Sequence, residues 1–158
     1  MRAVVQVTSE CSLACDGKTL WSIGRGMCVL LGIAKNDTQS VADKMIDKLL
    51  KLRIFPDENG KLNLSALQTG AEIAVISNFT LYADASRSRR PDFAGAMPFS
   101  DASVLYESFL ASIRHQSEAW TEEGQTAPRI YGGVFGGDMQ VSIVNDGPLT
   151  VILDSDTF

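Results

Sequence analysis

The sequence has almost none of the side chains on which most metal sites and acid–base catalytic groups depend. It contains one histidine, His115, and three cysteines, Cys11, Cys15 and Cys28, with no CxxC pair. This set is too small for a zinc site and disfavours a Ser-His-Asp or Cys-His catalytic group. We therefore expect no metal and no cofactor. The cysteines are interpreted as buried or incidental thiols, and His115 as a surface or helix-capping residue.

Long apolar stretches and an excess of basic charge are also missing. The longest apolar run, residues 27–33, is too short to span a bilayer, and the N-terminal MRAVVQVTSE turns polar before a signal-peptide core could form. These features predict a cytoplasmic protein without membrane association. The net charge of −5 argues against a protein that coats nucleic acid indiscriminately. A local cluster, Arg87, Arg89 and Arg90, fits either phosphate contacts or a solvated loop with incidental charge.

Common catalytic and nucleotide-binding motifs are absent as well. The chain has no P-loop, no GxGxxG after a strand and no HExxH. The acidic pairs Asp57/Glu58 and Glu122/Glu123 fall in turn-like segments that we expect to be solvated. Any enzymatic activity therefore has to work without the usual acid–base groups.

The residues that are present describe an ordinary globular domain. Hydrophobic residues make up 45% and charged residues 21% of 158 residues, and no repeat or linker divides the chain. We therefore predict a single domain over residues 1–158.

Strand patterns dominate both ends of the chain, and two helical patterns separate them. Residues 3–15 and 19–23 form a predicted hairpin around Asp16-Gly17, and residues 27–33 are apolar enough for a strand buried on both faces. Asp37 or Thr38 can cap a first helix, and a second begins near Ser100. Further strands are expected at 72–79, 131–135, 138–144 and 149–153, with a turn at Asn59-Gly60 between short strands.

These elements predict an α+β fold. We expect a curled, barrel-like and mostly antiparallel sheet with two helices packed outside it. The residues that follow the second helix, HQSEAWTEEGQTAPR, lack periodicity and are interpreted as an exposed excursion.

Two short segments carry more small polar groups than their surroundings require. Ser77-Asn78-Phe79-Thr80-Leu81 closes an apolar strand, and Asn145-Asp146-Gly147-Pro148-Leu149-Thr150 interrupts two C-terminal strands. Taken alone, the first fits a capped strand end and the second a β-turn.

Four collinear blocks change that interpretation. The opening MRAVVQ, then KLRIFPDENGKLNLS, then SNFTLYAD with RRPDF, and finally FGGDMQVSIVNDGPLT together resemble the D-aminoacyl-tRNA deacylase family over almost the whole chain. The segment SEAWTEEGQTAP looks like a surface insertion near residues 116–129, relative to shorter bacterial members.

The resemblance implies hydrolysis of the ester of D-aminoacyl-tRNA, and of glycine mischarged on a non-cognate tRNA, by a homodimer with its active sites at the subunit interface. Binding energy and backbone donors would carry the catalysis, with the tRNA's terminal 2′-hydroxyl assisting. The implied catalytic residues are Ser77, Phe79 and Thr80, and the implied substrate-binding residues are Asn78, Phe135, Met139, Asn145, Gly147, Pro148 and Thr150. Phe135 and Met139 would hold the terminal adenosine. Gly147 and Pro148 would enter the other subunit's pocket and exclude L side chains.

Two positions depart from the family pattern. Val7 stands where many members have an arginine that braces the Gly-Pro element, and Asn78 stands where glutamine is usual. The intact NDGPLT block predicts a cis Gly147-Pro148 bond, whereas loss of the brace leaves open a relaxed editor that accepts L-alanyl-tRNA. A catalytically silent tRNA-binding dimer is the other alternative, and both intact blocks argue against it.

Overall fold

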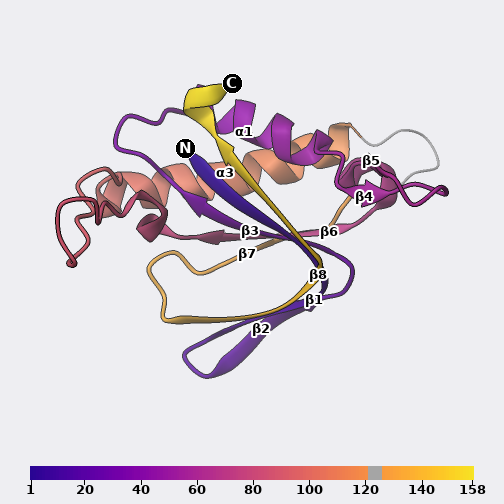
Figure 1. The fold of residues 1–158 in the computed structure, drawn as a ribbon, viewed down its shortest axis with the longest axis horizontal. Helices are drawn as coiled ribbons and strands as arrows, with labels where there is room; N and C mark the ends of the chain where they lie inside the picture. Colours follow the sequence, from indigo (N-terminus) through magenta and orange to yellow (C-terminus); the bar gives the residue numbers. More distant parts are fainter. Residues whose placement is uncertain (121–125) are drawn as a thin grey trace.

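The computed structural model describes residues 1–120 and 126–158, and a strongly curled sheet forms its centre (Figure 1). The sheet order is β2-β1-β3-β6-β7, and β8 pairs with β1. The strands are β1 (Arg2–Cys15), β2 (Lys18–Ile23), β3 (Gly26–Gly32), β4 (Phe55–Pro56), β5 (Leu62–Leu64), β6 (Glu72–Ser77), β7 (Ile130–Gly132) and β8 (Met139–Asp154). The helices are α1 (Gln39–Lys51), α2 (Ala66–Thr69) and α3 (Phe99–Ala119), with 3₁₀ turns η1 (Phe79–Tyr82) and η2 (Ser155–Thr157).

Strand β1 causes the curl because its two halves pair with different neighbours. Its first half pairs with β3 and its second half with β2, while β8 follows both halves along the opposite edge. The predicted β1–β2 hairpin is confirmed, and Asp16 and Gly17 in its turn both have positive φ. The curled sheet encloses a small second core cluster, in which Cys11, Cys28 and Ile76 are buried.

The sheet is mixed. Strand β1 pairs antiparallel with β2, β3 and β8, in agreement with the prediction of a mostly antiparallel sheet, but two other pairings are parallel. Strands β3 and β6 are parallel, and so are β6 and β7. Both connections contain a helix, as parallel strands require, because their chain must cross back over the sheet. Burial of β3 on both faces agrees with the prediction for residues 27–33.

Helices α1 and α3 cover one face of the sheet and lie beside each other (Figure 1). Their apolar sides, including Met45, Leu49, Tyr106 and Phe109, complete the main core cluster together with residues of β1, β3 and β6. No helix in the described part of the chain is long and apolar enough to cross a membrane.

A third helix, α2, was missed because four residues are too few to show a period. Ser65 and Gln68 form a reciprocal capping box at its start, and Gly70 ends it in the left-handed region at φ 65°. The first helix is preceded by Thr38, whose side chain makes no capping hydrogen bond. Asp37 accepts instead from the backbone N–H of Ala34, at 2.6 Å.

Helix α3 is longer than the sequence predicts and runs to Ala119. Residues 115–119 therefore belong to a helix and not to an exposed excursion, because Ser117 turns inward and is 1% exposed. His115 lies exposed on this helix, in agreement with its predicted surface position. Part of the predicted insertion, residues 121–125, lies outside the described residues.

The C-terminal strands predicted at 138–144 and 149–153 are one strand, β8, with an irregularity between them. Both parts stay paired with β1, so the NDGPLT segment bulges from a continuous ladder and does not separate two strands. The three cysteines are free and buried, as predicted.

Candidate active site

The SNFTL segment occupies the end of β6, where the chain leaves the sheet. Ser77 lies opposite Leu31 in the parallel β3–β6 pair. The backbone N–H of Asn78 donates to the Leu31 carbonyl at 2.8 Å, which fixes the first residue outside the strand. The next residue, Phe79, begins the 3₁₀ turn η1. A buried, rigid strand therefore positions a short exposed turn.

The turn begins with backbone donors that lie next to two polar side chains. The N–H of Phe79 donates to no group in residues 1–120 and 126–158, as is usual for the first donor of a helical turn. The Thr80 hydroxyl donates to Oδ1 of Asn78 at 2.5 Å. The ring of Phe79 is 58% exposed and meets Phe93 edge-on, with 5.1 Å between centroids. An unpaired backbone N–H can stabilise a developing oxyanion.

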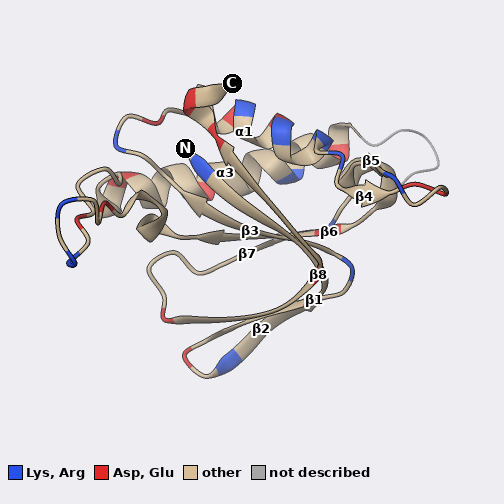
Figure 2. Ribbon diagram, viewed as in Figure 1, with Lys and Arg blue, Asp and Glu red and all other residues tan. Residues whose placement is uncertain are grey.

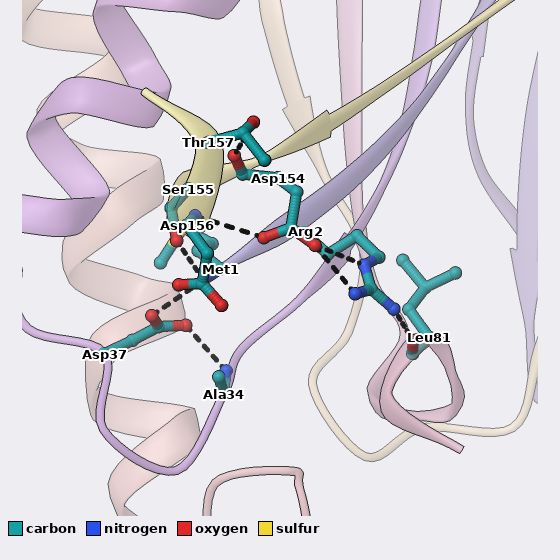
Figure 3. Close-up of polar contacts among 9 residues, drawn as sticks. All are labelled: Met1, Arg2, Ala34, Asp37, Leu81, Asp154, Ser155, Asp156 and Thr157. Carbon is teal, nitrogen blue, oxygen red and sulfur yellow. Dashed lines mark hydrogen bonds and ion pairs between the residues drawn. The ribbon is translucent and has the colours of Figure 1, made fainter. Parts of the chain in front are cut away.

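Arg2 anchors the far end of this turn, and sequence reasoning missed it. Its Nη1 donates to the Leu81 carbonyl at 3.0 Å, and its Nε and Nη2 donate to Oδ2 of Asp154 at 2.9 and 2.7 Å (Figure 3). Its guanidinium also lies over the Tyr82 ring, 5.0 Å from the centroid. One side chain thereby joins β1, the end of β8 and η1.

Hydrogen bonds keep the Asp154 carboxylate of this ion pair ionised. Burial raises the pKa of Asp154, but hydrogen bonds from Arg2 and from the N–H of Asp156 outweigh it, so the net pKa is lowered. Beside it, the Met1 amino group donates to Asp37 at 2.7 Å and to Ser155 at 2.5 Å (Figure 3). These contacts fasten the end of β8 to the start of β1.

Phe135 lies in an aromatic cluster that extends from α3. Its ring centroid is 5.1 Å from that of Phe99 and 5.6 Å from that of Tyr106. The Tyr106 hydroxyl donates to the Val75 carbonyl at 2.8 Å and accepts from the Gly133 N–H at 2.9 Å. Burial raises the pKa of Tyr106 to about 12, so the hydroxyl stays protonated and holds β7 to β6.

Met139 lies on the other side of the sheet from the core that contacts Phe135. It packs against the cluster inside the curled sheet, whereas Phe135 packs against the main core. The two residues predicted to hold an adenosine are both half-buried but belong to different clusters. Their role in holding an adenosine stays a prediction.

The NDGPLT segment forms the irregularity of β8. On β1, Gln6 pairs with Thr150 and Thr8 pairs with Asn145. Val7 is therefore the one β1 residue opposite the four residues 146–149 of β8. The Gly147-Pro148 peptide bond is cis, as the NDGPLT pattern predicts.

Gln6 joins the two ends of this segment, which the sequence did not reveal. Its Oε1 accepts from Nδ2 of Asn145 and, at 3.0 Å, from the Thr150 hydroxyl. Val7, which stands where many relatives have a bracing arginine, is 6% exposed and offers no polar group. The polar support of the segment therefore comes from its neighbour along β1.

The two segments do not meet within one chain. Ser77 shares a row with Leu31 and Ala3, whereas the Gly-Pro element lies beside Val7. Four residues along β1 correspond to about 13 Å, and β8 and β6 lie on opposite sides of β1 and β3. The two segments are therefore well separated within one chain.

Comparison with known proteins decides which family this arrangement belongs to. The family model described as D-Tyr-tRNA(Tyr) deacylase matches residues 4–154. D-aminoacyl-tRNA deacylases from Chlorobaculum tepidum and Clostridium botulinum (strain 657) are 47% and 44% identical, each over 98% of this chain and 97% of the relative. The chain belongs to the D-Tyr-tRNA(Tyr) deacylase family.

Two solved structures share the fold of this chain. The c-Myc DNA unwinding element binding protein is 41% identical and superposes with a TM-score of 0.87 over 98% of both chains. A probable eukaryotic D-amino acid tRNA deacylase, 17% identical, shares the fold with a TM-score of 0.78 over 96% of this chain and 97% of its own. Membership of the deacylase family makes the chain an ester hydrolase that acts on aminoacyl-tRNA.

The deacylase site has no grouping of potential metal ligands. Within residues 1–120 and 126–158, no cluster of three or more His, Cys, Asp or Glu side chains is arranged to hold a metal ion.

Proposed function

We propose that the chain removes D-amino acids, and glycine attached to a non-cognate tRNA, from the 3′ end of tRNA in the cytoplasm, and thereby proofreads chirality. Water adds to the ester carbonyl, the tetrahedral intermediate collapses, and the products are the free amino acid and tRNA with its terminal hydroxyl restored. The observation that carries this proposal is the unpaired N–H of Phe79 at the exposed end of β6.

The N–H of Phe79 stabilises the oxyanion of that intermediate. Its position is set by the Asn78–Leu31 backbone hydrogen bond, so the donor is organised before substrate arrives. Ser77 and Thr80 supply hydroxyls near the reacting carbonyl. Because Thr80 donates its proton to the Asn78 amide oxygen, its own oxygen is left to accept a hydrogen bond from the attacking water. The terminal 2′-hydroxyl of the tRNA assists the attack of water.

Chirality is read by the other subunit of a homodimer. The carbonyls of Gly147 and Pro148 of the partner subunit hold the α-amino group of the substrate, and an L side chain would collide with that backbone. Glycine has no side chain to exclude and is accepted. The separation of the two segments within one chain supports this use of a partner.

A proline substitution tests the backbone donor directly. Phe79→Pro removes the N–H, and Asn78, at φ −144° and ψ 89°, already lies outside the helical region that a following proline disfavours. Phe79→Ala is the matched control, since it loses the same ring but keeps the N–H. We expect Phe79→Pro to lower kcat for D-alanyl-tRNA about 10²–10³-fold below Phe79→Ala. Equal kcat values for the two variants would overturn the assignment of this donor.

A relaxed editor of L-alanyl-tRNA is the second candidate, and Val7 is the observation that favours it. An apolar residue there cannot brace the Gly-Pro element as an arginine would. Parallel hydrolysis of D-alanyl- and L-alanyl-tRNA separates the two functions. D-specific proofreading requires faster hydrolysis of the D-ester, and faster hydrolysis of the L-ester would establish the relaxed editor.

A further inference from the structure

The loop between η1 and α3 forms a closed, outward-pointing finger. Its base is a pair of backbone hydrogen bonds between Asp84 and Asp92, at 2.7 and 2.8 Å. Inside it, the N–H of Ser86 donates to the Asp84 carboxylate at 2.8 Å, and the Ser88 hydroxyl donates to the Arg90 carbonyl at 2.6 Å. These hydrogen bonds give the loop a defined backbone. We call residues 84–92 the basic finger.

The tip of the finger carries an uncompensated positive charge. Arg87, Arg89 and Arg90 are all exposed, and none forms a salt bridge with a carboxylate in the described part of the chain. The carboxylates of Asp84 and Asp92 at the base accept backbone N–H groups of Ser86 and Ala94. Figure 2 shows the basic positions at the outer end of this loop, away from the other basic residues. Three clustered cations in a chain of net charge −5 indicate an anionic partner.

The base of the finger is attached to the candidate active site. Phe93, the residue after the finger, packs edge-on against Phe79, with 5.1 Å between ring centroids. The N–H of Met97 donates to the Ile33 carbonyl at 3.0 Å, which ties the segment after the finger to the residue that follows β3. Arg90 is three residues from Phe93, so their Cα atoms are at most about 11 Å apart. The arginines therefore lie within reach of groups close to an ester bound at Phe79.

We infer that Arg87, Arg89 and Arg90 bind phosphates of the tRNA acceptor end and hold its sugar–phosphate backbone beside the catalytic turn; this inference rests on the proposed function. Guanidinium groups bind phosphate oxygens through paired hydrogen bonds. Phosphate contacts position a nucleic acid without reading its sequence. The finger would therefore serve every aminoacyl-tRNA, while discrimination stays with the pocket.

The test compares two D-alanyl esters that differ in their phosphates. One is D-alanyl-tRNA, and the other is the 2′(3′)-D-alanyl ester of adenosine, which has none. For the variant R87Q/R89Q/R90Q we expect KM for D-alanyl-tRNA to rise at least about tenfold, with unchanged turnover of the adenosine ester. The slope of log affinity for uncharged tRNA against log salt concentration should become shallower by about 2–3. The variant makes fewer phosphate contacts, so its binding releases fewer counterions from the tRNA.

Two control variants separate charge from folding. R87K/R89K/R90K keeps the charge, so the salt slope should stay near that of the unmodified chain. K18Q/K44Q/K61Q removes the same amount of charge from exposed positions elsewhere and should leave both KM and slope unchanged. An R87Q/R89Q/R90Q variant with unchanged KM and slope, or with equal losses on both esters, would overturn the inference.

Failure of the proposed function would give a different result. In that case the unmodified chain would hydrolyse neither D-alanyl ester. Binding of uncharged tRNA would still report on the arginines, since loss of salt-dependent binding in R87Q/R89Q/R90Q needs no catalysis. Unaltered tRNA binding by that variant would show that the basic finger does not contact tRNA.

Discussion

The hydroxyl of Thr80 is held as an orienting group and not as an activated nucleophile. Its proton goes to the Asn78 amide oxygen at 2.5 Å, and no histidine or carboxylate in the described part of the chain hydrogen-bonds to it. An alcohol without a base is a weak nucleophile. We therefore expect Thr80→Val and Ser77→Ala to lower kcat for D-alanyl-tRNA about 10- to 100-fold without abolishing it.

Single-turnover assays with matched tRNA-binding measurements check this expectation. Thr80→Ser is the control, since it keeps the hydroxyl and should retain most of the activity. A Thr80→Val variant with normal tRNA binding and no detectable turnover would point to a side-chain nucleophile in place of the backbone donor.

At the scale of single residues, the sequence predicted the two motif segments but not the side chains that support them. Ser77 to Thr80 and Gly147-Pro148 lie in contiguous motifs, so resemblance was enough to select them. Gln6 and Arg2 act on residues 139 to 152 positions away in the chain. No local pattern encodes such partners, because they follow from strand register.

Three elements depend on Arg2, which makes its ion pair with Asp154 a measurable part of the fold. The pair joins β1 to the end of β8, and the Leu81 carbonyl adds η1. Both side chains are partly exposed, at 38% and 21%, so the pair contributes modestly. We expect Arg2→Met to lower stability by about 1 kcal/mol and Tm by about 2–4 °C at pH 7.

The pH dependence of this effect follows from the lowered pKa of Asp154. A carboxyl whose folded pKa lies below its unfolded value of about 3.9 stabilises the fold above that pH. The stabilisation disappears as pH falls through the folded pKa. Thermal melts should therefore show the Tm difference between Arg2→Met and the unmodified chain shrinking below about pH 4. Lys61→Met, at an exposed site, is the control, and a Tm difference that grows in acid would contradict the assignment.

Sequence reasoning recovered most elements but misjudged how they pair. Apolar periodicity located β3, β6 and α1 because burial dictates composition directly. Strand direction leaves no such trace, so the parallel β3–β6 and β6–β7 pairs were missed. The extension of α3 to Ala119 was missed because its last turn is polar, with only Ser117 facing inward.

On the scale of the whole molecule, β8 is an unusually long edge. It has 16 residues and pairs with β1 on one side, and no described strand pairs with its other side. Val144 and Ile152 expose apolar side chains there, at 55% and 66%. An exposed edge presents unpaired backbone groups with which another chain can pair. This geometry agrees with the proposed homodimer.

We predict an obligate two-fold dimer under assay conditions. A Gly-Pro element that acts in the partner's pocket requires two chains, and a closed two-fold pair satisfies both chains at once. Sedimentation should give a dimer at every concentration at which specific activity is constant. A sedimenting monomer with full activity at nanomolar concentration would exclude the shared site.

Mixing two inactive variants gives the sharpest test of that shared site. Phe79→Pro damages only the catalytic turn, and Gly147→Val damages only the Gly-Pro element. At Gly147, φ is 116°, and an added Cβ would lie 2.9 Å from the Leu149 nitrogen. In a mixed dimer, the Gly147→Val subunit keeps an intact turn and receives an intact Gly-Pro element from its partner. Random exchange makes half of the dimers mixed, each with one sound site of two, so activity should recover to about one quarter of the unmodified level.

The chain that carries both changes provides the opposite control. In a dimer of this double variant with an unmodified subunit, each site has one damaged part. The intact turn receives the altered Gly-Pro element, and the altered turn receives the intact Gly-Pro element. Adding the double variant should therefore inactivate unmodified subunits in proportion to the mixed dimers formed, whereas sites built within one chain would leave them active. Recovery in the first mixture together with inhibition in the second requires a site assembled from two subunits. Absence of both, with exchange confirmed by native mass spectrometry, would assign each site to a single chain.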